Sequence, residues 1–351
     1  MLPHGSASDA DLFAVSGVAS DDYWAVGARS LDHGADAATY AEHWDGTAWQ
    51  PVRVPRPEDS VNDTFSRVVA LTSSNVWAVG WAQPNFVEVA PFASHWNGRR
   101  WSTMYLKIPK GAKDTFASDV DGTSATDVWA VGSAGTFQSA QPLIEHWDGD
   151  RWSIAAQPAD LPKNAELGGV RVISADDVWA VGEKTVAGRT LPFAEHYDGT
   201  SWKVMRVPLP QGRTEAYLLD VAGDVSRDLW AVGATPTHHP VIEHWNGHRW
   251  QAEPAHAAGQ DMLATSVSVM APDDVWVAGD TLDHHPVFVH WDGSAFHQVQ
   301  VKTHASFIEG LASTSGNDAM AVGITITGRG GNATITPAHL RWNGHTWRDQ
   351  N

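Results

Sequence analysis

The sequence contains no cysteine. This absence excludes disulfide bonds and thiolate metal ligands. No run of about 18 apolar residues occurs either, so no transmembrane helix is expected. The N-terminal residues lack a basic stretch followed by an apolar core, so no secretion signal is visible. We expect a soluble protein, and the cytoplasm is the favoured compartment.

Basic residues are also scarce. The chain of 351 residues has 23 Lys and Arg against 41 Asp and Glu, which gives a formal net charge of −18. Nucleic acids and anionic membranes bind through clustered Lys and Arg, and the chain has no basic run. We therefore expect neither of them as a partner, whereas the charge favours attraction to cations.

Several enzyme signatures are missing. The glycine-rich segment 328–331 has no helix behind it, so it does not resemble a phosphate-binding loop. The chain also lacks a Gly-x-Ser-x-Gly elbow, a His-Glu-x-x-His pair and an EF-hand loop. Nucleotide-dependent chemistry is not expected.

Tryptophan, by contrast, is abundant, and most of the 19 residues belong to a repeated motif. In one copy, residues 177–182 read Asp-Val-Trp-Ala-Val-Gly, residues 195–199 read Glu-His-Tyr-Asp-Gly, and Trp202 follows. The first landmark of the seven copies is Trp24, Trp77, Trp129, Trp179, Trp230, Trp276 and Met320. The second is Trp44, Trp96, Trp147, Tyr197, Trp245, Trp291 and Trp342. The third is Trp49, Trp101, Trp152, Trp202, Trp250, Phe296 and Trp347.

Each copy contains four short runs of strand-forming residues, and Asp-Gly or Asn-Gly separates the third from the fourth. Repeats of roughly 45 to 50 residues are typical of propellers. The sequence therefore predicts an all-β fold, a seven-bladed β-propeller with four antiparallel strands per blade. In the kelch-like strand order, the first strand lines the axis. We expect one domain, residues 1–351, with blades at about 9–55, 62–107, 113–157, 163–208, 214–254, 260–301 and 305–351.

The repeat resembles that of kelch-like propellers in its second run, in the aromatic-Asp-Gly end of its third run and in the Trp that opens the fourth. The resemblance covers essentially the whole chain, although the kelch double glycine is a single glycine here (Gly80, Gly132, Gly182). The repeat is also similar, more weakly, to the bacterial seven-bladed lectins whose blades carry His, Trp and Asp-Gly. Both resemblances imply a fold and no functional residues.

A histidine recurs before the second landmark in six copies, and Arg341 replaces it in the seventh. Because it recurs, we expect a structural, hydrogen-bonded residue that lies between blades. The six histidines are His43, His95, His146, His196, His244 and His290.

The connections between strands differ in length. Those from first to second and from third to fourth strand are short and uniform, and they share one face of the disc, called here the turn face. Those from second to third strand and from fourth strand to the next blade are long and variable, and they share the opposite face, called here the loop face. Since variable loops on a rigid scaffold usually carry function, the loop face is the candidate site.

Histidines cluster in the loops of blades 5 and 6. Imidazoles with a nearby carboxylate such as Asp280 suit Zn, Cu, Fe or Ni, so a divalent metal ion is the candidate cofactor. The alternative is that the two blades are recent duplicates that share a solvated loop sequence. The candidate metal ligands are His238, His239, His284, His285, His256 and His304.

Oxygen-bearing side chains stand just before the first strand of six copies, where we expect them to rim the channel and bind a cation or basic ligand. The alternative is local capping of backbone amides. They are Asp9, Asp63, Asp114, Asn164, Glu215 and Asp261. Exposed aromatics of the loop face are candidates for stacking against a ligand or for packing the loops: Trp81, Phe86 and Phe137.

Charged residues on the inner strands are the catalytic candidates, because burial that shifts one carboxylate pKa permits acid–base chemistry. More often, such residues line a water-filled channel and pair with each other. They are Arg67, Asp119, Asp121, Arg171, Asp220 and Glu309.

Three functions remain open. The first is a monomeric binding module whose loop face and channel mouth hold a small molecule, peptide, glycan or protein. The second is an enzyme, with or without a metal ion, that acts as a hydrolase, lyase or oxidase at the channel mouth or at the histidines. The third is a multivalent lectin, which needs equivalent exposed pockets in each blade.

Overall fold

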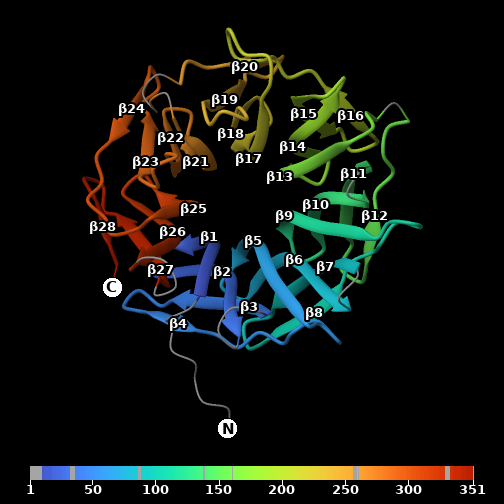
Figure 1. Cartoon of the computed structure of the whole chain (residues 1–351), viewed down its shortest axis with the longest axis horizontal. Helices are drawn as coiled ribbons and strands as arrows, with labels where there is room; N and C mark the ends of the chain where they lie inside the picture. The colour runs from blue at the N-terminus through green and yellow to red at the C-terminus, as the bar shows by residue number, and fades with distance from the viewer. Residues whose placement is uncertain are drawn as a thin grey trace.

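The computed structural model describes residues 10–31, 36–85, 88–136, 139–159, 161–255, 259, 261–328 and 333–350. These residues form 28 strands in seven groups of four, arranged as a ring around a central hole (Figure 1). Blade 1 consists of β1 (Ala10–Ala19), β2 (Asp22–Leu31), β3 (Asp36–Trp44) and β4 (Trp49–Pro51). Blade 2 consists of β5 (Asn62–Thr72), β6 (Asn75–Asn85), β7 (Glu88–Trp96) and β8 (Trp101–Tyr105). Blade 3 consists of β9 (Asp114–Ser124), β10 (Asp127–Thr136), β11 (Ser139–Trp147) and β12 (Trp152–Ile154).

The remaining four blades follow the same plan. Blade 4 consists of β13 (Ala165–Ser174), β14 (Asp177–Val186), β15 (Arg189–Tyr197) and β16 (Trp202–Met205). Blade 5 consists of β17 (Tyr217–Val225), β18 (Asp228–Ala234), β19 (Pro240–Trp245) and β20 (Trp250–Ala252). Blade 6 consists of β21 (Leu263–Ala271), β22 (Asp274–Asp280), β23 (Pro286–Trp291) and β24 (Phe296–Val299). Blade 7 consists of β25 (Phe307–Ser315), β26 (Asp318–Thr327), β27 (Thr334–Trp342) and β28 (Trp347–Asp349).

Consecutive strands pair antiparallel within each blade, and the first strand lies nearest the axis (Figure 1). Blades 2 and 3 form one eight-stranded sheet because a single parallel bridge joins Val89 to Asp114, and each of the other five blades is a separate four-stranded sheet. The predicted all-β propeller is confirmed.

The third-to-fourth turn is built by its own residues. In blade 1 the Asp45 carboxylate accepts the amide N–H groups of Thr47 (2.9 Å) and Ala48 (2.9 Å). Gly46 adopts a φ of 89°, which disfavours any residue with a Cβ. The Asp-Gly or Asn-Gly pair therefore fixes each turn locally, as the sequence pattern predicts.

The core lies between neighbouring blades. The ring of Trp24 in blade 1 lies 5.0 Å from Trp96 and 5.3 Å from Trp101 in blade 2, measured between centroids. The same three landmarks meet at the following interfaces, and Met320 takes the place of the tryptophan in blade 7. Because each aromatic cluster contains residues of two blades, packing favours a closed ring.

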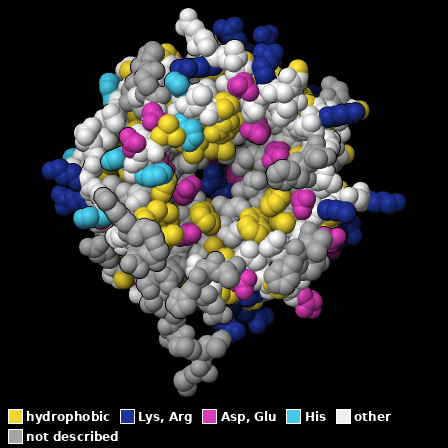
Figure 2. Space-filling view, viewed as in Figure 1, with side chains coloured by type: hydrophobic (Ala, Val, Ile, Leu, Met, Phe, Trp, Pro, Cys, Tyr) yellow, Lys and Arg dark blue, Asp and Glu magenta, His cyan; other side chains and the backbone are white. Residues whose placement is uncertain are grey.

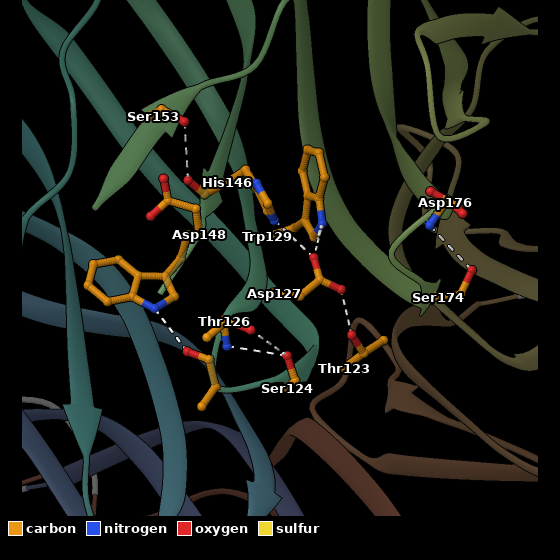
Figure 3. A network of polar contacts seen from close by, with 12 residues as sticks. Thr123, Ser124, Thr126, Asp127, Trp129, His146, Asp148, Ser153, Ser174 and Asp176 are labelled. Atoms are coloured by element: carbon orange, nitrogen blue, oxygen red, sulfur yellow. Dashed lines mark hydrogen bonds and ion pairs between the residues drawn. The ribbon is translucent and has the colours of Figure 1, made fainter. Parts of the chain in front are cut away.

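The repeated histidine is hydrogen-bonded within its own blade and lies beside the next one. His146 Nε2 donates to Asp127 Oδ1 at 2.9 Å (Figure 3), and the side chain borders a hollow together with Tyr197 and Trp202 of blade 4. The same carboxylate accepts the Trp129 indole N–H and the Thr123 hydroxyl. The cross-strand pairing of Trp129 with His146 places both side chains beside Asp127, which begins the strand of Trp129.

The ring closes without exchange of a strand between the terminal blades, since β28 pairs with β27 of its own blade. Side chains join blades 7 and 1 instead. The Tyr23 hydroxyl donates to Asp318 at 2.8 Å, and Arg341 donates both to Asp318 and to the Ser20 carbonyl. The described residues include no helix long and apolar enough to cross a membrane.

Candidate functional site

The half of the channel nearest the turn face is lined by satisfied carboxylates. Asp119 Oδ2 in blade 3 accepts the amide N–H of Val170 in blade 4 at 2.7 Å, and Asp121 Oδ2 accepts that of Val172 at 2.7 Å. Asp220 Oδ2 in blade 5 likewise accepts the amide of Val267 in blade 6 at 2.9 Å. These side chains thus link the inner strands of adjacent blades.

Charge is balanced in the same region. Arg171 donates to Asp121 at 3.2 Å and to the Gly223 carbonyl of blade 5 at 2.6 Å. Burial raises the pKa of Asp119 and of Asp121, and the nearby Arg67 and Arg171 oppose that rise in turn. Since these carboxylates already accept backbone amides, their contacts are those of structural links.

Arg67 lies across the middle of the channel. Its Nη1 donates to the Phe13 carbonyl of blade 1 at 3.1 Å and approaches the Glu309 carbonyl of blade 7 at 3.5 Å. Its Nη2 donates to the Thr265 carbonyl of blade 6 at 3.3 Å. One side chain of blade 2 therefore contacts three other blades and separates the two halves of the channel.

The other half opens on the loop face as a hollow of about 470 Å³, called here the channel mouth. It is formed by the first halves of the inner strands, which follow the fourth-to-first loops. Figure 2 shows acidic side chains around the central opening and basic side chains at its base. The charged and phenolic residues of its lining are Arg67, Glu166, Glu183, Tyr217 and Glu309.

The acids of the channel mouth differ from those below in having no donor. Glu166 and Glu183 face each other across β13 and β14, and Glu309 stands on β25 with Asp11 close to it. Among the described residues, none of these four carboxylates makes a hydrogen bond or an ion pair. Arg67, the nearest base, is already bonded to backbone carbonyls. The acids of the channel mouth therefore outnumber its bases, although the charge of Arg67 offsets part of the negative charge at Glu309.

Their protonation equilibria reflect this environment. Burial raises the pKa of Asp11, Glu166, Glu183 and Glu309. The negative charge of Glu166 raises the pKa of Glu183 further, and that of Glu183 adds to the effect of burial on the Tyr217 phenol, whose pKa is also raised. A positive charge placed among these groups would lower their pKa values and be bound in return.

The predicted histidine cluster is two copies of one turn. The His238 amide donates to the Thr235 carbonyl and the His284 amide to the Thr281 carbonyl, each at 2.9 Å. Both histidines adopt positive φ, 56° and 61°. Figure 2 shows histidines gathered at one side of the loop face.

Other contacts of these histidines are separate from one another. His239 Nδ1 lies 3.1 Å from the Thr237 hydroxyl, the ring of His284 packs against Phe307, and His304 pairs with Asp349. His285 donates its amide to the Thr281 hydroxyl. His256 lies outside the described residues, within which no group of three or more His, Asp or Glu side chains is placed to hold a metal ion.

Residues of the predicted acidic ring accept hydrogen bonds, two of them from the amides of the preceding blade. Asp63 accepts the Thr39 amide at 2.8 Å and the Arg56 guanidinium at 2.7 Å, and Glu215 accepts the Thr190 amide at 3.2 Å. The Leu282 amide donates to Asp261 at 3.4 Å. Asp114 forms the bridge to Val89, Asn164 adopts a φ of 56°, and Asp9 lies outside the described residues.

Of the three aromatic candidates of the loop face, one lies within the described residues. Trp81 packs edge-on against Phe116 of blade 3, with ring centroids 6.2 Å apart, and Phe86 and Phe137 lie outside the described residues.

The sequence pattern did not identify three residues of the channel mouth, Glu166, Glu183 and Tyr217. Glu166 follows the alternation of β13 that points every second residue to the axis, but Glu183 occupies the position after Gly182 in β14, at which the copies differ.

No protein-family model matches the chain, and no curated protein matches it. Solved propellers match its fold. A polysaccharide lyase described as an ulvan lyase bound to a GlcA–Rha3S unit aligns over 99% of this chain and 97% of its own, with a TM-score of 0.58 and 10% identity. YCF48 bound to D1 peptide aligns over 95% and 92%, with a TM-score of 0.57 and 13% identity. The six-bladed fungal lectin of Aleuria aurantia aligns over 83% and 95%, with a TM-score of 0.53 and 11% identity. At these identities the comparisons show the propeller fold alone.

Proposed function

We propose that the protein is a binding module that holds a positively charged group of its ligand in the channel mouth. The observation that carries this proposal is the set of carboxylates at Asp11, Glu166, Glu183 and Glu309, none of which has a donor among the described residues. An ammonium or guanidinium group supplies several donors and a compensating charge. A peptide or protein segment with an exposed lysine or arginine fits this requirement.

The surroundings support a ligand larger than an ion. The channel mouth has a volume of about 470 Å³, in the range of small-ligand sites, and it opens on the face that carries the variable loops. Arg67 closes its base, so a side chain inserted from the loop face stops beside Glu309. The formal charge of −18 assists the approach of a basic partner.

The test is binding of peptides that carry arginine or lysine to the wild type and to the double variant Glu166→Gln/Glu183→Gln. We expect affinity to fall about tenfold or more in the double variant, which corresponds to roughly 1.4 kcal/mol. The matched control is Asp150→Asn/Asp224→Asn, which removes two exposed charges from the turn face. If the two double variants lose the same affinity, only the general charge matters and the proposed site is wrong.

A second candidate function is acid–base catalysis at the same place. Glu166 and Glu183 are direct cross-strand neighbours with raised pKa values, which is how paired carboxylates acquire different protonation states. The Tyr217 phenol lines the same hollow. Incubation with a panel of polysaccharides tests it: new reducing ends that depend on Glu183 would favour an enzyme, and intact polymers would favour the binding module.

We infer that the kinship with kelch-like repeats is limited to the blade plan. Three landmarks per blade and a first strand at the axis support that plan. The single glycine at Gly80, Gly132 and Gly182 departs from the kelch signature. Solving a structure in which blade geometry is compared directly with kelch propellers tests this kinship.

A further inference from the structure

The loop face is lower over blades 5 and 6 than over the other blades. In those two blades a single residue pair joins the second and third strands beyond the repeated glycine, whereas three or four pairs do so in the other five. The connecting residues 234–240 and 280–286 are called here the low sector. The matching connection of blade 4, residues 183–192, has three more residues shared between two strands, so it rises roughly 5 Å higher.

The low sector consists of two copies of one closed turn. In blade 5 the Thr235 amide donates to the His239 carbonyl at 2.9 Å, and in blade 6 the Thr281 amide donates to the His285 carbonyl at 3.0 Å. Leu282, in the blade 6 turn, is 54% exposed, the highest value among the exposed large apolar side chains of the described residues. The low sector therefore offers an apolar contact on the loop face.

The hairpin of blade 4 borders the low sector with a carboxylate of the channel mouth. Trp179 and Val181 of β14 pack in the core between blades 4 and 5. Since side chains alternate along a strand, Glu183 and Thr185 point to the same side as these two residues. Burial and then the charge of Glu183 raise the pKa of the Tyr217 phenol in blade 5, which agrees with this direction. Glu183 thus stands where the channel mouth meets the low sector.

The low sector lies within reach of a chain that is anchored in the channel mouth. Neighbouring strands are about 4.8 Å apart, so a connection between the second and third strands lies roughly 5–10 Å outward from the inner strand. An extended chain rises about 3.3 Å per residue and covers this path, together with part of the channel, in roughly three or four residues. Over the other blades the longer hairpins stand in the same path.

We propose that the partner is an extended peptide segment that lies over the low sector, with a basic side chain in the channel mouth and an apolar side chain on Leu282. This inference rests on the proposed function, because the channel mouth anchors the segment. An extended chain is about as thick as the step of roughly 5 Å, and its backbone can pair with the Thr185 hydroxyl. The formal charge of −18 favours a basic segment over an acidic one.

The experiment measures the binding of short peptides that contain one arginine to the intact protein by isothermal titration calorimetry. One series moves a single leucine from the second to the fifth position after the arginine, and the reference peptide has serine in its place. We expect at least one leucine peptide to bind about tenfold more tightly than the reference. Leu282→Ser should remove this gain and leave the affinity for the reference peptide unchanged.

Val186→Ser is the matched control. Val186 is also an exposed apolar side chain of a second-to-third connection, at 44%. It alternates with Val178 and Ala180, which pack against blade 3, so it points away from the low sector. This variant should keep the full gain from leucine. The double variant Glu166→Gln/Glu183→Gln should weaken the leucine peptides and the reference peptide by the same factor.

The outcomes separate this inference from the proposed function. The inference is overturned if no leucine position improves the affinity, or if Leu282→Ser and Val186→Ser reduce the gain equally. In either case, weaker binding of the arginine peptides to Glu166→Gln/Glu183→Gln leaves the proposed function intact. If no arginine peptide binds, or if that double variant binds them all as the wild type does, the proposed function fails and the inference fails with it.

Discussion

The two halves of the central channel contain the same residue types in opposite circumstances. Below Arg67, Asp119 and Asp121 accept amide N–H groups from the next blade. Above it, Glu166, Glu183 and Glu309 also stand on strands, but none of them has a donor among the described residues. A carboxylate count alone would treat both halves as candidate sites. The hydrogen-bond partners separate them, because the lower acids hold the ring together and the upper acids are free to bind.

The largest effect should come from breaking a lower link. Asp119→Ala leaves the amide N–H groups of Val120 and Val170 without their acceptor at a buried interface. We expect a loss of about 2–3 kcal/mol in the free energy of unfolding, measured by chemical denaturation. An unfolding midpoint equal to that of the wild type would contradict the structural assignment of the lower half.

A buried carboxyl group inside blade 5 gives a second test of how hydrogen-bond partners determine what a carboxylate contributes to stability. Glu243 is fully buried, neither of its oxygens is hydrogen-bonded within the part of the chain that the structure describes, and burial raises its pKa to about 8. Val289 holds the same position in blade 6. Glu243→Val should therefore raise the free energy of unfolding by about 1–2 kcal/mol at pH 8.

The pH dependence of that gain has a definite sign. Below the ordinary glutamate value of 4.5, Glu243 is protonated in both the folded and unfolded states. Between that pH and about 8, the unfolded chain ionises while the folded chain keeps its proton, so the wild type loses stability relative to the variant. A stability difference that does not grow over this range would show that Glu243 has a partner.

The upper acids should respond in the opposite way to the lower ones. Glu166→Gln/Glu183→Gln removes two charges whose pKa values are raised in the folded state, so it should leave stability unchanged or raise it by about 0.5 kcal/mol near neutral pH. Thermal unfolding at neutral and acidic pH checks this, since the gain should vanish at acidic pH. A loss comparable to that of Asp119→Ala would make the upper acids structural as well.

The smallest effect expected is a pH dependence of binding. Because the pKa values of Glu166 and Glu183 are raised, affinity for a guanidinium ligand should begin to fall at a pH above the ordinary glutamate value of 4.5. Titrations of the same arginine peptide over a series of pH values measure the midpoint. A midpoint at or below the ordinary value would place the ligand elsewhere.

Much of the fold was predictable, because seven copies of the landmarks and the Asp-Gly turns specify blades without knowledge of distant contacts. The partner of His146 was not, since it depends on the register that sets Trp129 opposite His146. The inner-strand charges were found as a group, but their hydrogen-bond partners lie in other blades, so spacing alone cannot separate Asp119 from Glu309. The low sector left a readable signal, since residues 234–240 and 280–286 form shorter connections than the matching residues of the other copies.

The most direct test of the account is a crystal structure of the protein soaked with an arginine-containing peptide. The account predicts a guanidinium group in the channel mouth, within hydrogen-bond distance of the Glu166 and Glu183 carboxylates and above Arg67. Peptide bound at another place while these carboxylates contact only solvent would contradict it.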